Sequence, residues 1–169
     1  GIPFVQNLVD GPFWRERSLR GNYPRVECPV FVVAGWADSY HTPLLRVFEN
    51  LDVPKRALIG PWSHQWPDQG IPGPRIDWQR EALKWWDYWL KGEQTGVMDE
   101  PPLTVFVRDY DPPATIRAVD SGRFRHESRW PIARTTQKVL YLDDEQTLAA
   151  KQPAAGEDTV TFDPRVGMC

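Results

Sequence analysis

The stretch that decides the fold runs from Val30 to Pro43 and reads VFVVAGWADSYHTP. It joins a continuous apolar run to a glycine, a tryptophan and an acid, Asp38. A second stretch at residues 56–64, RALIGPWSH, repeats this layout and ends on His64. Apolar runs without alternation are typical of strands in a parallel sheet that is covered on both faces. The sequence therefore predicts two buried parallel strands, each followed by a titratable side chain.

Two helices are predicted around these strands. Thr42 and Pro43 are residue types favoured at the N-cap and the first position of a helix. Residues 78–92, WQREALKWWDYWLKG, carry apolar side chains at helical spacing. Lys91 and Gly92 then supply the cation and the glycine that favour a helix C-terminus. The order strand, helix, strand, helix implies a right-handed parallel crossover and an α/β fold.

Composition limits the function classes. The chain has 169 residues with a net charge of −3, nine Trp and 17 Pro. Mixed charges argue against a nucleic-acid partner, which requires a basic stripe. No apolar run reaches the length of a membrane span, and no secretion signal is visible, so the sequence leans towards a cytoplasmic protein. Two cysteines, Cys28 and Cys169, are too few for a disulfide framework.

The pattern changes near residue 100. Residues 1–100 read as α/β, with a helical lead-in at residues 1–22, whereas residues 101–169 read as short strands between turns. The predicted strands are LTVFV at 103–107, KVLYLD at 138–143 and DTVTFDP at 158–164. Neither part has enough strands to cover its own faces, so we expect a fragment whose sheet is completed by preceding sequence or by another chain.

Asp38 and His64 follow consecutive strands, and binding or catalytic groups of open α/β sheets lie beyond the carboxyl ends of strands. A carboxylate that holds one ring nitrogen of a histidine prepares the other nitrogen to take a proton from a nucleophile. In α/β-hydrolases the order along the chain is Ser, then Asp or Glu, then His. No serine of this sequence lies in a G-x-S-x-G turn, and Cys28 reads as buried packing. The nucleophile is therefore expected before Gly1.

Six blocks of the sequence resemble the cocaine-esterase / X-Pro dipeptidyl-peptidase (CocE/NonD-type) family of serine hydrolases. They are GPFWRERS, VFVVAGWADSY, GPWSH, LKWWDYWLKG, PPLTVFV and FDPRVG. The resemblance implies that residues 1–100 are the last part of an α/β-hydrolase domain and that residues 101–169 begin a jelly-roll domain. It also implies that Asp38 is the triad acid and His64 the general base, with the serine and the oxyanion hole outside this chain.

Other interpretations remain open for each residue. Asp38 could cap the following helix, and His64 could be an ordinary hydrogen-bonded histidine. Trp36 and Trp62 are candidates for an acyl or aromatic pocket, although packing under the loops is equally consistent with them. His41 could join Asp38 and His64 in a metal site, but these do not form a clear tetrahedral set, so neither metal nor cofactor is expected.

The expected partners follow from the resemblance to this hydrolase family. An intact enzyme would take a small ester or a short peptide and could form a homo-oligomer. The isolated chain is expected to be inactive. The alternative is a non-catalytic binding or interaction module built on the β region.

Overall fold

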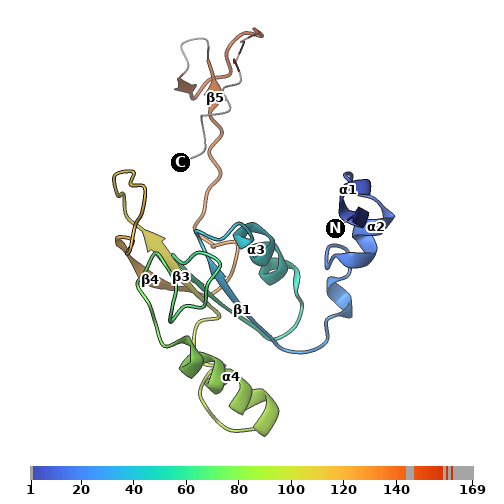
Figure 1. Cartoon of the computed structure of the whole chain (residues 1–169), viewed down its shortest axis with the longest axis vertical. Helices are drawn as coiled ribbons and strands as arrows, with labels where there is room; N and C mark the ends of the chain where they lie inside the picture. The colour runs from blue at the N-terminus through green and yellow to red at the C-terminus, as the bar shows by residue number, and fades with distance from the viewer. Residues whose placement is uncertain (1, 144–146, 158, 160, 162–169) are drawn as a thin grey trace. The chain divides into compact units, whose positions relative to one another are not determined.

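The computed structural model describes residues 2–143, 147–157, 159 and 161. Four strands form one sheet in the order β1 (Val30–Gly35), β2 (Lys55–Gly60), β3 (Leu103–Arg108) and β4 (Gly122–Glu127) (Figure 1). β2 is parallel to both β1 and β3, whereas β4 is antiparallel to β3. The predicted parallel strands are therefore confirmed, and the sheet is mixed with a parallel majority.

One face of the sheet is covered by helix α3 (His41–Asn50). Alternate residues of the parallel strands point to this side, and Phe48 of α3 packs against them. The buried cluster consists of Val32, Ala34, Phe48, Ala57, Ile59, Leu103 and Val105. Because β3 supplies two of its members, the core extends across the position where the sequence changes character.

The other face carries helix α4 (Trp78–Lys91). Asp77 caps its start by accepting a hydrogen bond from the amide of Arg80, and Gly92 ends it in the left-handed conformation, at φ 75°. Trp85 is buried, and its ring lies 6.1 Å from that of Phe31 on β1. The predicted helix and its glycine end are thus confirmed. Its second apolar row stays largely exposed within this chain, namely Leu83, Trp86 and Leu90.

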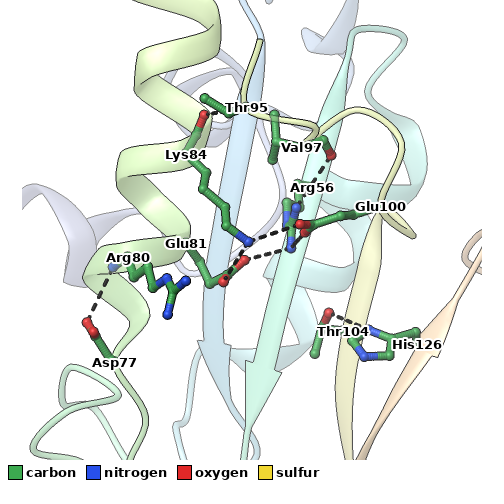
Figure 2. Close-up of polar contacts among 10 residues, drawn as sticks. All are labelled: Arg56, Asp77, Arg80, Glu81, Lys84, Thr95, Val97, Glu100, Thr104 and His126. Atoms are coloured by element: carbon green, nitrogen blue, oxygen red, sulfur yellow. Dashed lines mark hydrogen bonds and ion pairs between the residues drawn. The ribbon is translucent and has the colours of Figure 1, made fainter. Parts of the chain in front are cut away.

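A charged network joins α4 to β2 (Figure 2). Arg56 of β2 is almost fully buried and pairs with Glu81 at 2.9 Å and with Glu100 at 2.5 Å. Lys84 lies 3.0 Å from Glu100 and 3.4 Å from Glu81. Each cation thus contacts both carboxylates, which compensates the guanidinium for the water that it loses on burial. The network ties the helix to the sheet and to the segment that leads into β3.

The chain divides into two compact units, with the boundary between Ala133 and Arg134. The first also contains α1 (Ile2–Gln6), α2 (Pro12–Arg17) and the 3₁₀ helix η1 (Tyr23–Arg25), which confirm a helical lead-in. The second contains the pair β5 (Tyr141–Leu142) and β6 (Leu148–Ala149). The four-stranded sheet continues across residue 100, and the jelly roll over 101–169 stays a prediction.

Two local predictions were wrong, and one lies partly outside the described residues. Thr42 is not the N-cap, because α3 already begins at His41 after Tyr40. Cys28 is exposed rather than buried. The strand expected at 158–164 falls largely on residues that the structure does not describe. Among those it does describe, no helix is both long and apolar enough to span a bilayer.

Candidate active site

Asp38 lies in the tight turn that follows β1. Its amide donates to the carbonyl of Gly35 at 3.1 Å, which closes the turn. Its Oδ1 accepts a hydrogen bond from the amide of Tyr40 at 2.9 Å, as in an Asx turn. This local bond explains why the helix begins before Thr42, since Asp38 organises the residues ahead of it. The turn fixes the carboxylate at the carboxyl end of the sheet.

His64 meets this carboxylate from the neighbouring loop. Its Nδ1 lies 2.8 Å from Oδ2 of Asp38, a hydrogen-bond distance. The side chain of Asp38 is 11% exposed, whereas that of His64 is 79% exposed. With Nδ1 engaged by an acceptor, Nε2 is the nitrogen left for exchanging a proton with another group. The structure thus brings together the two residues that the sequence pattern singled out.

The loops that carry these residues are joined through Trp62. Parallel pairing sets Gly35 opposite Gly60, so both strands end at the same level. The carbonyl of Trp62 then accepts a hydrogen bond from the amide of Ala37 at 3.1 Å. A Cβ at Gly35 would overlap this carbonyl oxygen, so the close approach requires glycine there.

Local charges and hydrogen bonds set the ionisation of Asp38. Desolvation is the largest single influence and acts to raise the pKa of this carboxyl. Hydrogen bonds from the Tyr40 amide and from His64, with the charges of His64 and His41, act in the opposite direction. Together they hold the pKa below its ordinary value. Asp38 is therefore ionised at neutral pH, as a carboxylate that orients an imidazole must be.

This lowered pKa predicts a pH-dependent contribution to stability. A carboxyl whose pKa is lower in the folded state stabilises the fold above its unfolded pKa of about 3.9. That contribution is lost as the pH falls through the folded pKa. We expect Asp38→Asn to lower the free energy of unfolding near neutral pH, with the difference from wild type shrinking in acid.

Urea denaturation from about pH 3 to about pH 7 measures this difference. Asp52→Asn, at an exposed position between α3 and β2, is the matched control and should show no such change. A loss in Asp38→Asn that stayed constant over the whole pH range would contradict the prediction.

The two tryptophan candidates occupy different environments. Trp36 is half-buried, and its Nε1 donates to the carbonyl of Phe106 at 2.7 Å. Trp62 is only 1% exposed, and its Nε1 donates to the carbonyl of Pro74 at 2.8 Å. Both indoles thus hold neighbouring segments in place, which favours the packing interpretation that the sequence left open.

Sequence reasoning did not single out Tyr40. Its ring centroid lies 5.5 Å from that of His64, so it packs beside the exposed imidazole. The only signal was its position two residues after the acid. The Nδ1 of His41 contacts the carbonyl of Asp38 at 2.5 Å. Within the described part of the chain, no three His, Cys, Asp or Glu side chains are grouped to hold a metal.

A cavity of about 390 Å³ lies elsewhere, on the face of the sheet that carries α4. Phe31, Leu58 and Phe124 supply much of its apolar lining, and the charged network of Arg56 and Lys84 borders it. Neither Asp38 nor His64 lines this cavity. It is therefore separate from the paired acid and imidazole.

Comparisons with known proteins agree with the sequence resemblance. Residues 5–66 match the X-Pro dipeptidyl-peptidase (S15 family) model. A Mycobacterium bovis protein named "Putative serine esterase" is 27% identical over 164 residues, or 92% of this chain. A Bacillus anthracis protein named "Putative Xaa-Pro dipeptidyl-peptidase" is 33% identical over 98 residues, or 55% of this chain. The sequence relatives therefore include both an esterase and a peptidase by name.

The structural comparison supports the fold. The crystal structure of a CocE/NonD family hydrolase from Staphylococcus aureus aligns with a TM-score of 0.60 and 20% identity, over 83% of this chain and 23% of that one. The chain also spans only 23% of the mycobacterial relative and 15% of the Bacillus relative. This chain thus corresponds to a minor part of much longer proteins.

Proposed function

We propose that this chain supplies the acid and the base of a serine hydrolase, because residues 5–66 match the X-Pro dipeptidyl-peptidase (S15 family) model and the fold is similar to that of a CocE/NonD family hydrolase. The intact protein cleaves an ester or an amide through an acyl-enzyme. The nucleophilic serine lies in sequence outside this chain. The chain alone therefore has no turnover.

The hydrogen bond between Asp38 and His64 is the observation that carries the proposal. In the first step Nε2 of His64 takes the serine proton as the serine oxygen bonds to the substrate carbonyl carbon. His64 then gives that proton to the leaving alcohol or amine as the acyl bond breaks. Water then attacks the acyl-enzyme in the same two steps, with His64 taking its proton and returning it to the serine, and the carboxylic acid product is released. Asp38 stays ionised and stabilises the imidazolium in each step.

The substrate class is a small ester or a short peptide. The names of the relatives favour both, since one relative is named for a serine esterase and another for an Xaa-Pro dipeptidyl-peptidase. A p-nitrophenyl ester and an Ala-Pro anilide distinguish the two activities. Turnover of one but not the other by the full-length protein assigns the class.

A covalent serine probe tests the reaction type on the full-length protein. We expect a fluorophosphonate to label one serine outside residues 1–169, because an activated serine reacts with such reagents. Asp38→Asn should slow the labelling. A non-catalytic binding module would remain unlabelled, and that result would reject the proposal in favour of the alternative.

A further inference from the structure

Residues 61–76, here called the His64 loop, form a closed structure after β2. The amide of Ser63 donates to the carbonyl of Ile71 at 3.0 Å, which joins the two sides of the loop next to His64. The amide of Ile76 donates to the carbonyl of Pro67 at 3.1 Å. The histidine itself is 79% exposed, so the body of the loop, rather than burial of the ring, determines where His64 lies.

The far side of the His64 loop is bound to the connection between β3 and β4. The amide of Gly73 donates to the carbonyl of Ala118 at 2.7 Å, and the amide of Asp120 donates to the carbonyl of Gly73 at 3.0 Å. Gly73 and Val119 thereby form an isolated parallel bridge. Residues 118–120, here called the clamp, are thus in direct contact with the loop that presents the imidazole.

A buried carboxylate holds the clamp itself. The side chain of Asp120 is 1% exposed and bonds through Oδ2 to the guanidinium of Arg108, the last residue of β3. Its Oδ1 lies 3.7 Å from Nη1 of Arg117. Arg117 also pairs with Asp111 at 3.1 Å, and Asp111 accepts hydrogen bonds from the amide and hydroxyl of Ser121 at 2.9 Å. Charges of alternating sign therefore fix this connection to the end of β3.

From these contacts we infer that Asp120 is a positioning residue for His64, a role that rests on the proposed serine-hydrolase function. Asp120 touches neither Asp38 nor His64, and it acts through the Gly73 bridge. Loss of its charge leaves Arg108 and Arg117 without their shared partner and frees the clamp to move. The His64 loop then loses its fixed contact with the clamp, and the imidazole no longer keeps its geometry towards Asp38.

Asp120→Asn in the full-length protein tests the inference, because it keeps the shape of the side chain and removes the charge. We expect hydrogen–deuterium exchange of amides in residues 61–76 to rise about tenfold, with β1 and β2 unchanged, because only the loop is released. The kcat should fall on the order of 10- to 100-fold at unchanged KM, since small displacements of catalytic groups have effects of this size. Asp109→Asn is the control. It removes an exposed carboxylate that lies in the same connection, 3.8 Å from Arg123, and it should leave the exchange and the kcat unchanged.

Arg117 provides a second variant in case Asp120→Asn does not fold. Its side chain is 26% exposed, so Arg117→Met should be tolerated and should show the same pattern at smaller amplitude, with Arg117→Lys restoring part of kcat. Wild-type exchange of residues 61–76 in the folded variants would overturn the inference. Equal acceleration in β1, β2 and the loop would overturn it too, because it would show general destabilisation. Exchange does not require turnover, so failure of the hydrolase proposal would be seen separately, as an unlabelled protein.

Discussion

His64→Ala in the full-length protein should lower kcat on the order of 10⁵- to 10⁶-fold, the loss typical of removing the base from a catalytic triad. The physical reason is that, in the proposed mechanism, Nε2 of His64 is the group that takes the serine proton, and alanine offers no base in its place. The Nδ1 of His64 is already held by Asp38 at 2.8 Å, so the ring is oriented before substrate binds. Steady-state turnover of whichever ester or anilide the protein cleaves measures the effect.

His126 offers a matched control for this variant. It is an exposed histidine on β4, and its Nδ1 contacts Thr104 at 3.0 Å rather than any group at the strand ends. His126→Ala should therefore keep wild-type turnover. Full activity of His64→Ala, or an equal loss in both variants, would show that His64 is not the base.

Trp62→Ala should lower the free energy of unfolding by about 3–5 kcal/mol, as expected when a buried aromatic side chain is truncated. The indole is 1% exposed and its Nε1 donates to the carbonyl of Pro74. Glycines lie against it, and a Cβ at Gly60 or Gly70 would overlap its ring. Replacement by alanine leaves a cavity and an unpaired carbonyl. Urea denaturation followed by circular dichroism measures the loss.

Trp66 is the control in the same loop. It is 58% exposed and stacks on Trp78, with ring centroids 4.5 Å apart. Trp66→Ala should cost about 1 kcal/mol, because a partly solvated aromatic pair contributes little beyond the area that it buries. If Trp66→Ala lowered the free energy of unfolding as much as Trp62→Ala, burial would not be the reason for the effect at Trp62.

The sequence was sufficient to predict the parallel pair and the helix that ends at Gly92. Continuous apolar runs, a capped amphipathic segment and a terminal glycine are local signals, and they agree with one another. The pairing of Asp38 with His64 was also predictable, because parallel strands in register end at the same edge of a sheet. The similarity of these sequence blocks to known hydrolases then suggested the roles of triad acid and general base for Asp38 and His64.

The remaining features depend on contacts between segments far apart in sequence. LTVFV was predicted as a strand, but nothing local shows that it pairs with β2 in parallel. The clamp depends on backbone hydrogen bonds between Gly73 and residues 118–120, which carry no side-chain signature. The start of α3 was misplaced because the carboxylate of Asp38 organises the preceding turn more strongly than Thr42 favours a cap.

The sheet order has a consequence for self-association. β2, which leads to His64, is paired on both sides, whereas β4 forms one outer edge of the described sheet. The sequence of β4 is GRFRHE. Charged side chains such as its arginines disfavour the addition of a strand from a second molecule at an edge. The opposite border, β1, reads VFVVAG and has no such protection. For the isolated chain at high concentration, addition of a strand from a second copy is therefore expected at β1, beside the Asp38 turn, and not at β4. In the full-length protein, β1 is the edge at which we expect the preceding sequence to continue the sheet.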